Sequence, residues 1–71
     1  MSQEITAPMA GNIWKIHVGV GDQVKYEDEL MVLEALKMEN PIYAPADGTV
    51  AEIKVSENDA VEANQVLIVL G

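Results

Sequence analysis

The sequence predicts an all-β domain made of two copies of one structural unit. Residues 5–34 align with residues 42–71 at a constant offset of 37 without a gap, and 11 of the 30 aligned positions are identical. Each copy also alternates apolar and polar residues with period two, the pattern of a half-buried strand. Because self-similarity at a fixed offset indicates a repeated structural element, we expect both halves to fold alike.

Each copy opens with the pattern Ala-Pro-x-x-Gly, at residues 7–11 and 44–48. Proline restricts φ and glycine tolerates positive φ, so this pattern is typical of a turn. A strand is expected after each turn. In the first copy its alternation predicts that Trp14, Ile16 and Val18 face the core.

The second half of each copy contains a continuous apolar run, at residues 30–33 and 66–70. Such runs suit strands that are buried between two layers. Residues 26–40, taken alone, are rich in helix formers and favour a helix. Their repeat partner is β-branched and ends at Gly71, so we predict a strand in both copies.

The joint between the copies spans residues 35–41. The centre of residues 5–71 is (5 + 71)/2 = 38, which lies within this joint. One strand is expected to end near Glu34 and the next to lead into Ile42. The joint is therefore predicted to be a tight hairpin with Lys37 at or beside its tip.

The composition narrows the classes of function. Four lysines and no arginine stand against 12 acidic residues, for a net charge of −8, which argues against nucleic acid and anionic membrane surfaces as partners. With no cysteine and one histidine, the chain has no disulfide, no cysteine zinc site and no all-histidine metal site. No apolar run could span a bilayer and the start MSQEI lacks signal-peptide character, so we expect a cytoplasmic protein.

The usual catalytic residue types form no constellation in this sequence. His17 lies on the outward phase of a strand and corresponds to Lys54 in the repeat, so we interpret it as a solvated surface residue. The acidic run at residues 27–29 is interpreted as a solvated face, and Gly19-Val20-Gly21 as a turn. The chain is therefore not expected to be an enzyme.

Lys37 is the strongest candidate for a functional residue. It lies next to the symmetry centre, where a hairpin would project it, and it stands between Leu36 and Met38. A turn does not ordinarily expose two large apolar residues together. An exposed lysine with apolar neighbours suits recognition by a modifying enzyme, which must remove the ammonium proton before the nitrogen can react.

Around this lysine the sequence resembles biotinyl domains, the biotin carboxyl carrier family. Residues 34–40 resemble the family signature E-A-M-K-M-E-x, and they read Glu34, Ala35, Leu36, Lys37, Met38, Glu39 and Asn40. Residues 7–11, 20–24 and 44–48 resemble the family patterns A-P-M-x-G, x-G-D-x-V and A-P-x-x-G. Leu36 replaces the usual Met, and since leucine keeps its volume and apolarity we expect modification to survive. The resemblance covers the chain, residues 1–71, as one domain.

The resemblance implies a fold and a modification. The fold is a flattened β-barrel, or barrel-sandwich hybrid, of two four-stranded antiparallel sheets with internal quasi-two-fold symmetry. Biotin protein ligase would attach biotin covalently to Lys37, within the motif formed by Glu34, Ala35, Leu36, Met38 and Glu39. The short spacing from Asp22 to Lys37 implies the thumbless type, which lacks a protruding insertion.

The implied function is transport of a carboxyl group between a biotin carboxylase and a carboxyltransferase. The chain would act without catalysis of its own, as a monomeric carrier domain or subunit of a biotin-dependent carboxylase, decarboxylase or transcarboxylase. One alternative is a lipoyl carrier of a 2-oxoacid dehydrogenase complex, but lipoyl domains typically have Asp before and Ala after the lysine. Leu36 and Met38 favour biotin. The other alternative is an unmodified structural or assembly module in which Lys37 is only a solvated turn residue.

Overall fold

A computed structural model describes residues 2–71, which form eight strands within an elongated shape of 32 × 17 × 17 Å. No helix occurs in this range, and so none that is long and apolar enough to cross a membrane. The strands are β1 (Gln3–Thr6), β2 (Gly11–Ile16), β3 (Gln23–Val24), β4 (Glu29–Ala35), β5 (Met38–Tyr43), β6 (Gly48–Ile53), β7 (Ala60–Val61) and β8 (Val66–Leu70).

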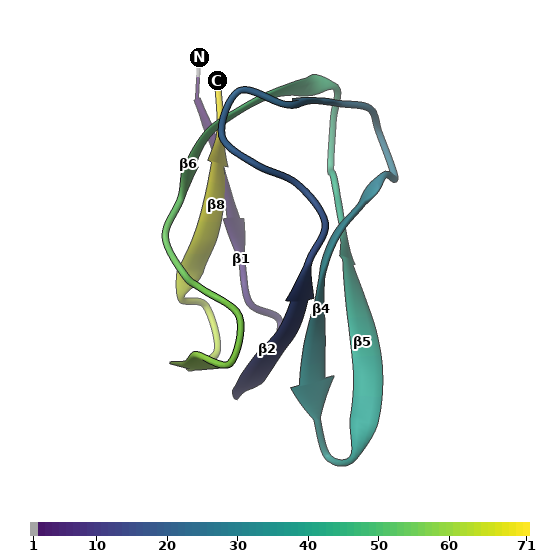
Figure 1. Ribbon diagram of the computed structural model, residues 1–71, viewed down its shortest axis with the longest axis vertical. Helices are drawn as coiled ribbons and strands as arrows, with labels where there is room; N and C mark the ends of the chain where they lie inside the picture. The colour runs from purple at the N-terminus through teal and green to yellow at the C-terminus, as the bar shows by residue number, and fades with distance from the viewer. Residues whose placement is uncertain (1) are drawn as a thin grey trace.

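The strands form two four-stranded antiparallel sheets that face each other (Figure 1). One sheet has the order β1-β8-β6-β3 and the other the order β5-β4-β2-β7. Each sheet therefore takes two strands from each copy of the repeat, so that neither half can complete a sheet alone. The predicted flattened barrel of two four-stranded sheets is confirmed.

The repeat of the sequence is also a repeat of strand register. Adding 37 to the bounds of β2 and β3 gives the bounds of β6 and β7. In the β1–β8 pair Ile5 lies opposite Ile68, and in the β5–β4 pair the equivalent residues Ile42 and Met31 lie opposite each other. The segment with high helix propensity, residues 26–40, contains the strand β4 and the start of β5, and it forms strand and not helix as the repeat predicted.

The hydrophobic core fills the space between the two sheets with equivalent residues from both copies. Burial of these side chains is the main stabilising term, because neither a disulfide nor a metal site among residues 2–71 supports this small fold. The buried equivalent pairs include Ile5 and Ile42, Ile13 and Val50, Val24 and Val61, Leu30 and Leu67, Met31 and Ile68, and Leu33 and Leu70.

The prediction that Trp14 faces the core is wrong. Trp14 is 45% exposed, whereas Ile13 is fully buried. The register against β4 shifts between Ile13 and Lys15, which places a β-bulge there, and the same shift occurs at the equivalent place in β6. One extra residue in a strand interrupts the alternation of faces, so period two could not assign the inward residues across the bulge. The strand also ends at Ile16, and Val18 follows it half-buried.

The turns of the two copies share the same side-chain caps. The backbone N–H of Gly19 donates to Asp22 Oδ2 at 2.8 Å, and Ser56 donates in the same way to Asp59 Oδ2 at 2.8 Å. Gly21 has a φ of 95°, in the region that glycine adopts at low cost. The interpretation of residues 19–21 as a turn is confirmed.

The acidic run at residues 27–29 is exposed, as predicted, but two of its members also have structural roles. Asp28 Oδ2 accepts a hydrogen bond of 2.9 Å from the backbone N–H of Lys25 and caps a turn. Glu29 begins β4. The run is therefore a solvated face that also closes the turn before this strand.

Candidate functional site

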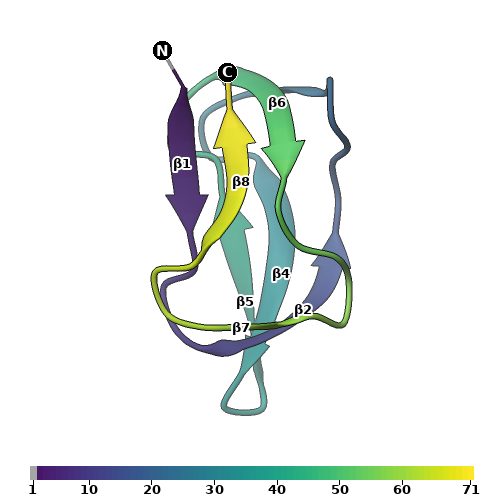
Figure 2. The same cartoon turned by 90° about the vertical axis from the view of Figure 1, so that its left-hand side faces the viewer.

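The candidate site is the hairpin that joins β4 to β5. The ladder between these strands continues to the pair Ala35 and Met38, so that Leu36 and Lys37 alone form the turn. The tight hairpin was predicted, but its loop is shorter than the expected joint of residues 35–41. Figures 1 and 2 show that the hairpin projects at one end of the long axis and that both chain ends lie at the other.

The backbone of the turn is strained. Leu36 has a φ of 55° and Lys37 a φ of 62°. Positive φ at both central residues is the type I′ pattern, which Asn-Gly adopts best. This left-handed conformation costs a residue with a Cβ roughly 1–2 kcal/mol. The paired strands on either side hold the turn in this conformation, and strain of this kind is found at functional sites.

The side chains at the tip are open to solvent. Leu36 is 88% exposed and Met38 is 65% exposed, while Lys37 between them is exposed as well. Residues 2–71 contain two ion pairs, and neither of them includes Lys37. The tip therefore presents a primary amine without a carboxylate partner in this range, flanked by two apolar side chains.

The structure brings the other predicted motif residues together at the base of the tip. Ala35 is buried and anchors the end of β4, whereas Glu34 and Glu39 are exposed and lie directly opposite each other. Two like charges in that arrangement lower stability slightly. Asn40 supports the hairpin, because its Nδ2 donates to the carbonyl oxygen of Met38 at 3.2 Å.

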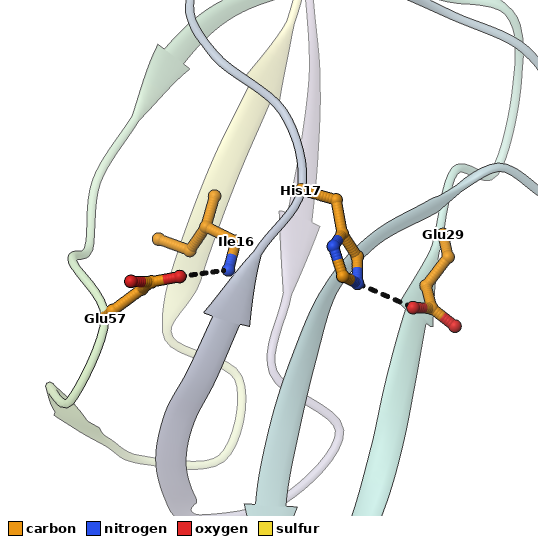
Figure 3. Close-up of polar contacts among 4 residues, drawn as sticks. All are labelled: Ile16, His17, Glu29 and Glu57. Carbon is orange, nitrogen blue, oxygen red and sulfur yellow. Dashed lines mark hydrogen bonds and ion pairs between the residues drawn. The ribbon is translucent and has the colours of Figure 1, made fainter.

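His17 directly follows the last residue of β2. The residue of β2 that pairs with Glu34, next to the lysine hairpin, is Asn12 near the start of the strand. Its Nε2 is 2.6 Å from Glu29 Oε2, and nearby the backbone N–H of Ile16 donates to Glu57 Oε2 at 3.1 Å (Figure 3). His17 is exposed, which agrees with its interpretation as a surface residue. Its ion pair with Glu29 was not predicted, since the two residues are 12 positions apart.

The second ion pair joins Lys54 to Glu52 in and beside β6. The hydrogen bond and the negative charge of Glu52 raise the pKa of the Lys54 ammonium above its ordinary value. Lys54 is therefore held by a carboxylate, in contrast to Lys37. Both lysines are exposed, but only the Lys54 amine is paired with a carboxylate among residues 2–71.

Comparison with known proteins decides the family. A family model described as biotin-requiring enzyme matches residues 3–70. The chain belongs to this family. Membership implies a covalently attached biotin, and the exposed amine at the end of a projecting hairpin fits such an attachment.

Relatives of the biotin-requiring family match the chain over most of its length. It is 46% identical over 66 residues to a biotin/lipoyl attachment protein of Bacillus subtilis, covering 93% of this chain and 90% of that one. It is 50% identical over 64 residues to a biotin carboxyl carrier protein of Streptococcus mutans, covering 90% of this chain and 49% of that one. The crystal structure of Kluyveromyces lactis urea carboxylase matches with a TM-score of 0.94 at 30% identity, covering 100% of this chain and 6% of that one.

The chain therefore spans nearly all of the Bacillus relative, about half of the Streptococcus relative and a small part of the urea carboxylase. The segment between Asp22 and Lys37 consists of β3, one turn and β4, which leaves no inserted protrusion.

Sequence reasoning missed the residues that the fold brings beside the hairpin. Asn12 lies opposite Glu34 in the β2–β4 ladder, and Trp14 and Asn58 line the same groove. No spacing in the sequence indicates this grouping. The lack of equivalent side chains at the matching positions of the other copy was the one available signal.

Proposed function

We propose that this chain is a biotin carboxyl carrier in which Lys37 holds biotin through an amide bond. The observation that supports this most directly is the exposed amine on a strained two-residue turn at the far end of the long axis, which forms no ion pair with any of residues 2–71. The family and the relatives supply the identity of the group. We assign the attachment to Lys37 because, of the four lysines, it alone has large exposed apolar neighbours on both sides.

Attachment requires a ligase and activated biotin. Biotin protein ligase joins the biotin carboxylate to AMP, using ATP and releasing pyrophosphate. A base of the ligase removes a proton from the Lys37 ammonium, and Nζ then attacks the activated carboxyl carbon. An amide bond forms, the bond to AMP breaks, and AMP leaves.

The chain's own residues present and orient the attachment point. The β4–β5 ladder holds the backbone of Lys37 in one conformation, while the long side chain remains free to swing. When bound, biotin supplies a ureido nitrogen that takes up a carboxyl group and releases it to an acceptor. Tethering keeps this group at a high local concentration near each partner site.

The partners of this carrier are a biotin carboxylase, a carboxyltransferase and the ligase. The chain serves as a monomeric carrier domain or subunit of a biotin-dependent carboxylase, decarboxylase or transcarboxylase, and it works in the cytoplasm. Similarity to a domain of urea carboxylase supports the first two partners. Each contact is brief, which suits a small acidic carrier that visits two sites in turn.

Intact mass spectrometry tests the proposal. The chain is incubated with biotin protein ligase, biotin and ATP, beside the variants Lys37→Arg and Lys54→Arg. We expect one added biotin on the parent and on Lys54→Arg, and none on Lys37→Arg. Modification by a lipoate ligase in place of the biotin ligase would favour the lipoyl alternative. A folded parent that neither ligase modifies would leave Lys37 as an ordinary turn residue.

A further inference from the structure

A groove of about 270 Å³ lies beside the base of the lysine hairpin. Glu34 at the end of β4 lies opposite Asn12 in β2, and the turn before β7 closes the groove. The backbone N–H of Asn58 in that turn donates to the carbonyl oxygen of Ile13 at 2.6 Å, which holds the turn against β2. The lining residues are Asn12, Ile13, Trp14, Glu34 and Asn58.

The lining combines three polar side chains with an aromatic ring. Glu34 offers carboxylate oxygens that accept hydrogen bonds, and the amides of Asn12 and Asn58 both donate and accept. Within residues 2–71, none of these three side chains has a hydrogen-bond partner in the protein. Trp14 is half-exposed, and Lys15 Nζ lies over its indole ring at 5.6 Å from the centroid.

The equivalent positions of the repeat show that the fold does not require these side chains. The positions that correspond to Asn12, Trp14, Glu34 and Asn58 are occupied by Thr49, Ala51, Gly71 and Gly21. The backbone at these places is equivalent, since the two copies share the same register and bulge. The groove beside Lys37 therefore combines Asn12, Trp14 and Glu34 of the first copy with Asn58 of the second, and none of the four equivalent positions carries the same side chain.

We propose that this groove is a resting site for the bicyclic ring of the biotin carried by Lys37. The proposal rests on the proposed function. The Glu34 carboxylate would accept hydrogen bonds from the ureido N–H groups, and the amides of Asn12 and Asn58 would donate hydrogen bonds to the ureido oxygen. The sulfur-containing ring would contact the exposed part of the Trp14 side chain.

The groove is within reach of the tether. Glu34 is three residues from Lys37, a separation of roughly 10 Å at the rise of an extended strand. The lysine side chain, the amide and the acid chain of biotin together are longer than this. A tethered ligand has an effective concentration on the order of mM, so an intrinsic Kd of that size populates the site about half of the time. The ring then remains available to partner enzymes.

Trp14 provides the test, because it is the single tryptophan of the chain. Acrylamide quenching of its fluorescence is measured on the unmodified chain and on the fully biotinylated chain, with modification verified by intact mass. At half occupancy the quenching constant is expected to fall by up to about half on biotinylation. Unmodified Lys37→Gln, which also lacks the lysine charge, should quench like the unmodified parent.

The repeat supplies matched variants of the groove. Asn12→Thr and Asn58→Gly each install the residue found at the equivalent position of the other copy, Thr49 and Gly21, and glycine suits the φ of 75° at Asn58. In the biotinylated variants we expect the quenching of Trp14 to return toward the unmodified value. Unchanged quenching in a fully biotinylated parent would overturn the resting site and leave the carrier function intact. If Trp14 stays protected from acrylamide in both biotinylated variants, the groove is not the site. If the parent cannot be biotinylated, both the resting site and the carrier function are overturned.

Discussion

Gly11 packs directly against the backbone carbonyl of Glu34, with no room for a side chain between them. This contact joins the start of β2 to the strand that leads into the lysine turn. A Cβ at Gly11 would collide with the Glu34 oxygen, whereas a Cβ at the equivalent Gly48 would meet its nearest atom at an ordinary 3.4 Å. The two equivalent glycines therefore differ in what they tolerate.

Gly11→Ala is expected to lower the free energy of unfolding by about 1–3 kcal/mol, because the backbone must shift to relieve the contact. Gly48→Ala should cost clearly less. Urea denaturation of both variants and the parent measures the difference. Equal losses at the two positions would contradict this account of the contact at Gly11.

Leu36→Asn is expected to stabilise the chain by roughly 0.5–1 kcal/mol, because asparagine adopts positive φ more readily and little buried apolar surface is lost. The same variant should be a poorer substrate of the ligase, since it removes one apolar neighbour of Lys37. Leu36→Met serves as the control and should leave stability within ~0.5 kcal/mol of the parent. Thermal or urea unfolding and initial rates of biotinylation give the two readouts, and a destabilised Leu36→Asn would argue against strain in the turn.

Leu30→Val and Leu67→Val are expected to destabilise the chain by similar amounts, about 1 kcal/mol each. Both leucines are fully buried at equivalent positions of the repeat. The two values should agree because the symmetric core surrounds each with equivalent side chains. Denaturation midpoints at a constant m-value test this, and a difference of more than ~2 kcal/mol would show that the core is not symmetric in energy.

His17→Ala is expected to change stability by less than ~1 kcal/mol, because its ion pair with Glu29 is exposed and screened by solvent. Biotinylation should proceed at the parent rate, since His17 is remote from the lysine turn. Unfolding measurements and ligase assays on the same preparation address both points. A marked loss of modification would assign His17 a role that its surroundings do not suggest.

Much of the fold and of the site could be predicted because the information is local or repeated. The 37-residue offset predicted strand in place of helix within residues 26–40, and the structure confirms it with β4 and the start of β5. The symmetry centre and the apolar neighbours pointed to Lys37 at the tip of a hairpin. The monomeric state and the cytoplasmic location remain predictions.

Features that depend on two strands at once could not be predicted. Trp14 was expected in the core, but a bulge is a mismatch between β2 and β4, and one strand's alternation does not contain it. The two-residue loop depends likewise on how far β4 and β5 remain paired.

The prediction of Lys37 as the attachment point and the two-fold plan of the barrel follow from the sequence, because a repeat and a short motif are properties of the chain itself. The grouping of Asn12, Trp14 and Asn58 beside Glu34 comes from tertiary structure alone. These residues are separated along the chain, and only the pairing of β2 with β4 and the turn before β7 brings them to one groove. Chemistry that requires such convergence is set by packing, which local sequence patterns do not encode.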